Sequence, residues 1–228
     1  MSSHTETERT RLQFQIDRIA FFSDAVIAIA LTLMILEIKI PEMGEKTTFQ
    51  QVMSQYGVTL ILHVIALLVG FITISNLWTQ HHALFEHITD YNNLLVRFNL
   101  YFLFTVMLLP ISISFLFTAH EPPLMQRIFY FSNLFLCSFT YSLMLRVIFN
   151  KKNHFYNIKD EQRIKDIRNN SYLGSVVFFI VLILASLNVT WFYVPFLIIP
   201  IYGIARKRKQ KKLQKLKAPV SKEQASHL

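Results

Sequence analysis

This sequence has almost no cysteine and little glycine. Of its 228 residues, 5 are glycine and one, Cys137, is cysteine. A single cysteine cannot form an intrachain disulfide, and Cys137 lies in an apolar stretch without a pattern of metal-ligating neighbours. We therefore interpret Cys137 as a small apolar filler, and it indicates nothing about the redox compartment.

Charged residues are also missing from long parts of the chain, which is 53% hydrophobic overall. Six apolar segments result, most of them close to the roughly 20 residues that cross a hydrocarbon core. We expect an all-α membrane protein with six transmembrane helices per subunit. The segments cover residues 19–40, 57–78, 98–118 with Pro110 inside, 124–149, 171–187 and 191–205.

The basic residues predict the orientation of these helices. With the N-terminus inside, 20 of the 23 lysines and arginines fall on the inner side, and Lys39, Lys46 and Arg127 fall on the outer side. Positive charge is enriched in cytoplasmic loops, so both termini are expected in the cytoplasm of a multi-pass plasma membrane protein. No cleavable signal peptide is convincing, because the first apolar segment is long enough to remain as a span.

Three regions follow from this layout. Residues 1–18 form a cytoplasmic N-terminal segment, residues 19–205 form the six-helix membrane domain, and residues 206–228 form a basic cytoplasmic tail. Such a tail beside a membrane helix favours contact with anionic lipid. We expect no nucleic acid partner, because no aromatic residue is interleaved with the lysines for base stacking.

The first apolar segment carries two different faces on a helix. At about 100° per residue, Ile29, Leu33 and Leu36 share one stripe with Thr32. Asp24 lies about 140° from Ile29, together with Ser23. An ionisable residue inside a membrane marks a functional site by default, but this placement favours a structural carboxylate that faces neighbouring helices.

Partners for Asp24 are expected at the inner ends of the second and third segments. Trp78, His81 and His82 end the second segment, and Asn99 begins the third, at the depth of Arg18 and Asp24. A hydrogen-bonded cluster of Asp24, Trp78, Asn99 and one of the two histidines would satisfy these buried polar groups. Which histidine contacts Asp24 stays open at this point.

The sequence shows no pattern typical of a metal site or of an enzyme active site. The histidines lack the spacing of a zinc site, so no metal or other cofactor is expected. His63, inside the second segment, is expected to form an interhelical hydrogen bond. The sequence offers no Ser/His/Asp set, no paired aspartates in two spans and no phosphate-binding loop, so we do not expect an enzyme.

One group of residues resembles a known family. Arg18, Phe22, Ser23 and Asp24, followed by Thr32 and Leu33, resemble the signature of the lysosomal potassium channel family, transmembrane protein 175, in its prokaryotic branch. Trp78, His81 and His82, and Asn99 with Pro110, also look like that family. The resemblance covers roughly residues 15–205.

The resemblance implies a homotetramer in which the first helix of each subunit lines a central pore. It implies a leak-type cation channel through which potassium permeates, without the usual filter. The pore constriction and ion selectivity would then belong to Ile29, Leu33 and Leu36, with Thr32 as a polar ring. Arg18, Ser23 and Asp24 would belong to the network between helices.

Selectivity over sodium is expected to be modest. The sequence has no Thr-Val-Gly-Tyr-Gly filter, so a ring of filter carbonyls cannot select potassium, and an apolar constriction would gate by dewetting. Glu37 would lie near the outer mouth, where it could concentrate cations or simply end a solvated helix.

An ion-coupled secondary transporter is the alternative. That class tends to interrupt its helices with glycine and proline near the midplane. The first two segments contain no proline and glycine is scarce, so the sequence favours the channel. A purely structural or assembly role also stays open.

Overall fold

The structure is a computed structural model. It describes residues 2–37, 48–117, 122–150, 152–153, 155–157 and 161–187. These residues form one compact unit that is all-helical, with a single isolated β-bridge between Ile88 and Tyr156. The sixth predicted segment, residues 191–205, and the basic tail lie outside the described residues.

Two long helices begin the fold. Helix α1 spans Ser2–Leu36 and helix α2 spans Phe49–Phe85. Thr48 caps α2: its hydroxyl accepts from the backbone N–H of Gln51, and the Gln51 side chain accepts in return from the backbone N–H of Thr48. This reciprocal arrangement satisfies two amides at the start of the helix.

The third predicted span is broken into two helices. Helix α3 spans Asn93–Met107 and helix α4 spans Leu109–Leu116, with a turn at Leu108 between them. Pro110 lies in the first turn of α4. Proline has no amide hydrogen and its ring clashes with the preceding turn, so it ends one helix and begins another.

Two further helices complete the described fold. Helix α5 spans Leu124–Ile148 and helix α6 spans Glu161–Leu187. Four serines join them inside the apolar layer. The Ser142 hydroxyl lies 2.6 Å from the Ser171 hydroxyl and 2.9 Å from that of Ser175, which in turn lies 3.1 Å from that of Ser138. Small hydroxyl residues at such a contact allow close approach and hydrogen bonds between helices.

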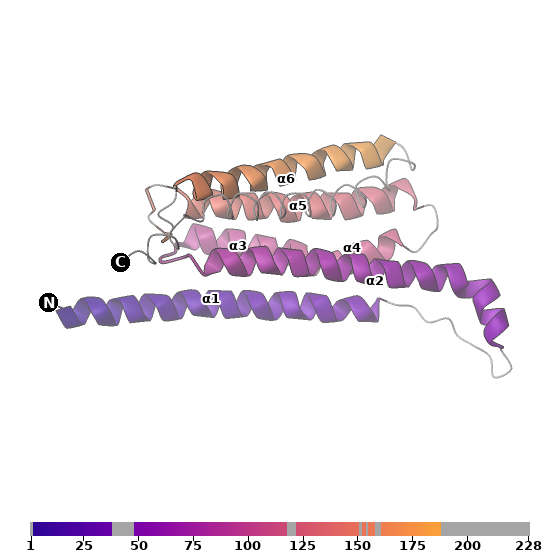
Figure 1. The fold of residues 1–228 in the computed structure, drawn as a ribbon, viewed down its shortest axis with the longest axis horizontal. Helices are drawn as coiled ribbons and strands as arrows, with labels where there is room; N and C mark the ends of the chain where they lie inside the picture. The colour runs from indigo at the N-terminus through magenta and orange to yellow at the C-terminus, as the bar shows by residue number, and fades with distance from the viewer. Residues whose placement is uncertain are drawn as a thin grey trace, which may run out of the picture. The chain divides into compact units, whose positions relative to one another are not determined.

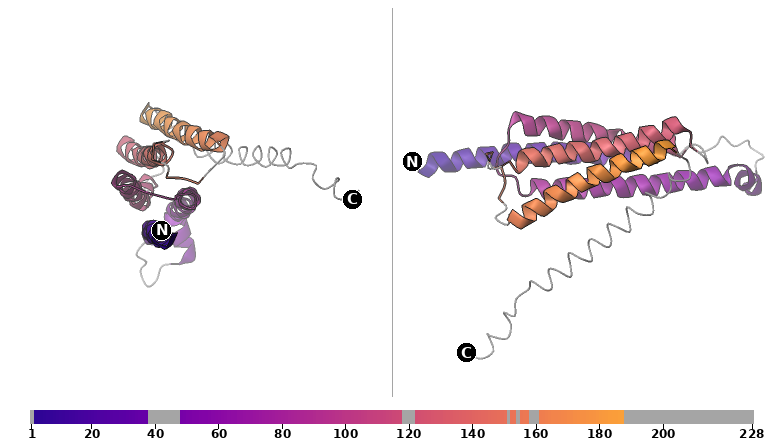
Figure 2. Two further views of the ribbon diagram at one scale, coloured as in Figure 1. Left: turned by 90° about the vertical axis from the view of Figure 1, so that its left-hand side faces the viewer. Right: turned by 90° about the horizontal axis from the view of Figure 1, so that it is seen from above.

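The helices lie side by side along one direction (Figures 1 and 2). Helices α1 and α6 lie on opposite sides of the bundle. Helix α1 packs against α2, α3 and α4, while α6 packs against α5, which also contacts α3 and α4. As a result, α1 keeps one face free within the described chain.

Within the described residues, five helical stretches are long and apolar enough to cross a membrane. They cover Thr10–Leu36, Phe49–Phe85, Asn93–Leu116 with its break, Leu124–Ile148 and Glu161–Leu187. The first five predicted apolar segments lie within or close to these helices, which extend further at several ends. Residues 49–56, which precede the second predicted segment, belong to α2.

The end of the bundle that holds the N-terminal half of α1 has its own apolar core, made of buried residues from α1, α2, α3, α5, α6 and two loops. The loops pair with each other: the backbone N–H of Thr89 donates to the carbonyl of Phe155 at 2.9 Å, and that of Asn157 donates to the carbonyl of His87 at 3.0 Å. Ile16 of α1 is buried in this core. The N-terminal half of α1 is therefore packed against the rest of the bundle at Ile16.

Candidate functional site

Helix α1 is divided lengthwise into a buried face and an exposed face. The buried residues of α1 are Ile16, Ser23, Ile27, Ala30 and Met34. At about 100° per residue they fall within about 60° of one another, on the side of the helix away from Ile29. This face packs against α2, α3 and α4.

The predicted pore-lining stripe is on the exposed face. Ile29 is 57% exposed, Leu33 39% and Leu36 74%, and Thr32 is exposed beside them. Branched apolar side chains with this exposure are expected to contact something outside the chain, either lipid or a second copy of the chain. The described chain leaves the stripe uncovered by its own helices.

The Thr32 hydroxyl has a defined direction. It donates its hydrogen to the backbone carbonyl of Ile29 at 2.8 Å. A hydroxyl oxygen has one hydrogen to give and two lone pairs that accept. Since the hydrogen is used within the helix, the oxygen of Thr32 is left as an acceptor on the exposed face.

A relay of hydrogen bonds crosses from α2 through α3 to α1. Nε2 of His81 lies 2.8 Å from Oδ1 of Asn99, and Nδ2 of Asn99 donates to the hydroxyl of Ser23 at 2.9 Å. Ser23 donates to the backbone carbonyl of Ile19 at 2.8 Å. Because an amide oxygen only accepts, His81 donates from Nε2. The three side chains are each at most 1% exposed, so the relay satisfies polar groups that water does not reach.

Asp24 lies beside this relay and not in it. Nε1 of Trp78 donates to Oδ1 of Asp24 at 2.9 Å. The ring of Trp78 stacks on that of His82, with 5.3 Å between centroids. His82 and Arg18 are exposed. The structure thus brings Ser23, Asn99 and His81 into one relay and joins Asp24 to α2 through Trp78.

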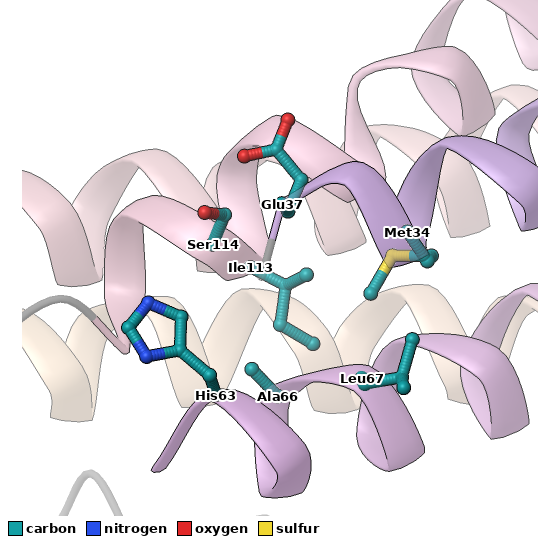
Figure 3. Close-up of a pocket in the computed structure, with 7 residues that line it drawn as sticks. All are labelled: Met34, Glu37, His63, Ala66, Leu67, Ile113 and Ser114. Carbon is teal, nitrogen blue, oxygen red and sulfur yellow. The ribbon is translucent and has the colours of Figure 1, made fainter. Parts of the chain in front are cut away.

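His63 departs from the prediction. It was expected to bond another helix, but its Nδ1 lies 2.7 Å from the carbonyl of Thr59, one turn earlier in α2. Its Nε2 is buried and has no hydrogen-bond partner among the described residues. Glu37, predicted at the outer mouth, is half-buried and lines a small chamber with His63. No pattern in the sequence indicates that these two residues line the same chamber (Figure 3).

The part of the chain that the structure describes contains no group of three or more histidine, cysteine, aspartate or glutamate side chains that could hold a metal ion. The sites available on α1 are therefore an apolar stripe with one hydroxyl and a polar network behind it.

Comparison with known proteins connects this geometry to a family. Residues 18–110, which include the relay and the stripe, match the family model of the endosomal/lysosomal potassium channel TMEM175. A potassium channel from Chryseobacterium is 27% identical over 187 residues, which cover 81% of this chain and 87% of the relative. Over residues 18–110 this chain is similar to the TMEM175 family. The resemblance predicted from Arg18, Phe22, Ser23 and Asp24 is confirmed.

Further relatives match over shorter stretches. A potassium channel from Chamaesiphon minutus is 33% identical over 104 residues, which cover 50% of that protein. The endosomal/lysosomal proton channel TMEM175 of Mus musculus is 29% identical over 107 residues, or 21% of that chain. The relatives in these matches are themselves named as potassium or proton channels.

Solved structures show the same fold. The crystal structure of a lysosomal potassium-selective channel TMEM175 homolog from Chamaesiphon minutus has a TM-score of 0.70 at 22% identity, and the match covers 84% of this chain and 97% of that one. The potassium channel MtTMEM175, solved in complex with a nanobody fusion, has a TM-score of 0.59 at 21% identity. The all-helical membrane fold of the TMEM175 family is therefore shared by this chain.

Proposed function

We propose that this protein is a potassium-permeable cation channel of the leak type, with modest selectivity over sodium. Four copies surround a central axis, and α1 of each copy lines the pore. Ile29, Leu33 and Leu36 form an apolar constriction, and Thr32 adds a ring of hydroxyl oxygens. The observation that carries the proposal is the uncovered stripe on α1, opposite the face that packs in the bundle.

The direction of the polar groups supports this arrangement. Ser23 and Asp24 are engaged with α3 and α2, so they are directed away from the stripe. An axis through the stripe is then lined by branched apolar residues, which oppose wetting of a narrow pore. The carboxylate holds α1 in place and does not contact the ion.

Thr32 supplies the polar contact in this proposal. Its hydrogen is donated to the Ile29 carbonyl, so its oxygen presents lone pairs toward the axis. Four such oxygens would replace part of the hydration shell of a potassium ion. A single ring of hydroxyls discriminates less strongly than the stacked carbonyl rings of a dedicated filter, which accounts for modest selectivity.

The proposal includes a location. With 20 of the 23 basic residues on one side of the predicted spans, both termini lie in the cytoplasm and the channel lies in the plasma membrane. The basic tail, residues 206–228, contacts anionic lipid of the inner leaflet. Residues 191–205 supply the sixth span.

Reconstitution tests this function directly. Purified protein in liposomes with a potassium gradient is expected to pass potassium, more slowly sodium, and to show discrete conductance steps in bilayer recordings. Liposomes without protein are the control. A turnover of only about 10²–10³ ions per second without conductance steps would instead indicate a carrier. A chain that moves neither ion would contradict the proposal.

A further inference from the structure

The loop between α2 and α3, residues 86–92, contacts the N-terminal half of α1. The hydroxyl of Tyr91 donates to Oε1 of Gln15 at 2.8 Å, and both side chains are half-buried. Figure 1 shows the end of α2 and the start of α3 at the same end of the bundle as the N-terminal half of α1. Gln15 lies about 12 Å along the helix from Ser23, at 1.5 Å per residue. This bond therefore holds a part of α1 that the relay through Ser23 does not reach.

The same loop is held on its other side by the loop between α5 and α6. Two backbone hydrogen bonds join the two loops, and Ile88 and Tyr156 form the isolated β-bridge between them. The Ile88 side chain is buried in the apolar core at this end of the bundle. A backbone that is paired and anchored in this way shifts only by losing hydrogen bonds and buried apolar area. The loop is therefore a fixed point against which α1 is held.

Tyr91 is itself fixed in direction. Its backbone N–H donates to Oδ1 of Asp90 at 2.7 Å. The next residue, Asn92, caps α3 by accepting from the backbone N–H of Leu95 at 2.9 Å. The ring of Tyr91 packs against the same apolar core. Because backbone and ring are already ordered, the hydroxyl reaches Gln15 with little further loss of side-chain entropy.

The bond lies where it opposes rotation of α1 about its own axis. At about 100° per residue, Gln15 lies about 40° from Ile29 around the helix, at the edge of the exposed face. The adjacent Ile16 is buried in the core, so two contacts about 100° apart hold the helix. A rotation of about 20° moves an atom about 5 Å from the axis by about 2 Å, which breaks a hydrogen bond of ordinary length. Since α1 is continuous from Ser2 to Leu36, the same rotation turns the stripe.

We propose that Tyr91 and Gln15 are positioning residues that set the rotation of α1 and thereby the direction of its exposed stripe. The consequence for ion flow rests on the proposed function, because the stripe must line the pore. Neither residue touches the ion. With the bond intact, α1 keeps one rotational setting. Without the bond, α1 moves more freely between settings, so the ratio of open to closed states changes while the constriction keeps its residues and its preference for potassium.

The bond is tested by melting four variants in detergent. Tyr91→Phe removes only the hydroxyl, and Gln15→Met keeps the length of the side chain without the amide oxygen. Each should lower the Tm by roughly 2–4 °C. The double variant should lower it no further, because the same bond is lost once. Gln15→Glu keeps an accepting oxygen and should retain the Tm of the unmodified chain.

Tyr101→Phe is the matched control for the loss of a hydroxyl. Tyr101 is exposed on α3, so this change should leave the Tm as it is. Additive losses in the double variant of Tyr91 and Gln15 would overturn the bond. A Tm of Tyr91→Phe equal to that of the unmodified chain would do the same.

The freedom of α1 is measured without ion flow. A spin label on Phe14→Cys, in a chain whose Cys137 is replaced by alanine, reports motion of α1 beside Gln15, since Phe14 is exposed. Tyr91→Phe and Gln15→Met should each increase the mobility of this label, and Gln15→Glu should not. A label on Met125→Cys, exposed on α5, is the control and should keep its mobility throughout. Equal mobility at Phe14 with and without the Tyr91 hydroxyl would show that the bond does not hold α1.

Bilayer recordings measure the effect on ion flow. Tyr91→Phe and Gln15→Met should change the ratio of open to closed time by about fivefold, at an unchanged conductance step and an unchanged preference over sodium. Gln15→Glu and Tyr101→Phe should resemble the unmodified chain. Greater label mobility with an unchanged ratio of open to closed time would refute control of the stripe, and an equally large loss of preference over sodium would place the two residues on the path itself. If the unmodified chain gives no conductance, the channel proposal fails, while the melts and the label still decide whether Tyr91 and Gln15 position α1.

Discussion

Ile29 is the residue whose position tests the proposed function most directly, because it must line the pore. Its side chain is 57% exposed in the single chain, and in the proposed tetramer it meets three copies of itself. Exposure alone does not separate pore from lipid, because Ile35 on the same helix is 62% exposed. The two isoleucines differ in direction, about 120° apart around the helix.

Replacing Ile29 by asparagine should raise potassium flux and reduce preference over sodium. An amide in the constriction favours water there, and lowering the barrier by about 1.4 kcal/mol raises the flux about tenfold. Ile35→Asn is the matched control, with the same change in chemistry on another face of α1. Flux assays in liposomes compare the two, and equal increases would show that the stripe does not line the path.

For single residues, some contacts of the polar network could be predicted from the sequence and others could not. Ser23, Asn99 and the adjacent histidines could be grouped because they share a depth in the membrane. The choice between His81 and His82 could not be made, since neighbouring residues differ by only 100° in direction and packing decides which is buried. The free nitrogen of His63 was also beyond the sequence, because it depends on which residues of α1 and α4 lie opposite.

At the scale of helices, α1 and α2 meet where a glycine faces a methionine. Gly70 is buried on α2, and a β-carbon placed there would collide with the end of the Met34 side chain. The next nearest atom would be Cδ1 of Ile113 at 3.5 Å. This contact sets the spacing between α1 and α2 on the face of α1 that lies opposite the exposed stripe.

Gly70→Ala should lower the stability of the fold, because the added methyl group forces Met34 to move, at about 1–3 kcal/mol for overpacking. Met34→Ala alone should also destabilise, by about 2–5 kcal/mol, because it leaves a cavity. The double variant should be more stable than the sum of the two changes predicts. Thermal melts in detergent measure this coupling, and strictly additive shifts would show that the two residues do not share the space.

The lengths of the helices could be predicted only in part. Hydropathy identifies the portion that lies in hydrocarbon, so the first predicted segment began at Ile19. The backbone hydrogen bonds of a helix continue into water wherever the residues permit, and α1 begins at Ser2. Pro110 was recognised inside the third segment, but the resulting division into α3 and α4 follows from how the chain packs after the break.

At the scale of the whole molecule, the proposal depends on copies of the chain meeting along α1. Within the part of the chain that the structure describes, no other helix covers the stripe. The tetramer is predicted only from the resemblance to the TMEM175 family. The number of copies in a symmetric assembly leaves no pattern in the sequence of one chain.

Four copies of the 26.8 kDa chain should be found by native mass spectrometry from mild detergent. Leu36→Cys, in a chain whose Cys137 is replaced by alanine, should form disulfide-linked dimers on oxidation, because the four sites surround one axis. Leu173→Cys on α6 is the control and should stay unlinked, since that helix lies on the other side of the bundle. A monomer in detergent, or linking at Leu173 alone, would contradict the arrangement.

The unbroken course of α1 has a practical consequence. Its 35 residues make a rod about 50 Å long at 1.5 Å per residue, and the stripe lies in its last third. Because Ile16 anchors this rod in the apolar core, a bulky fusion partner or an antibody fragment attached at the first residues would, in the proposed channel, strain the same helix that carries the stripe. Tags for recording are therefore better placed at the C-terminus, and a binder directed at the N-terminus becomes a tool for opening or closing the path.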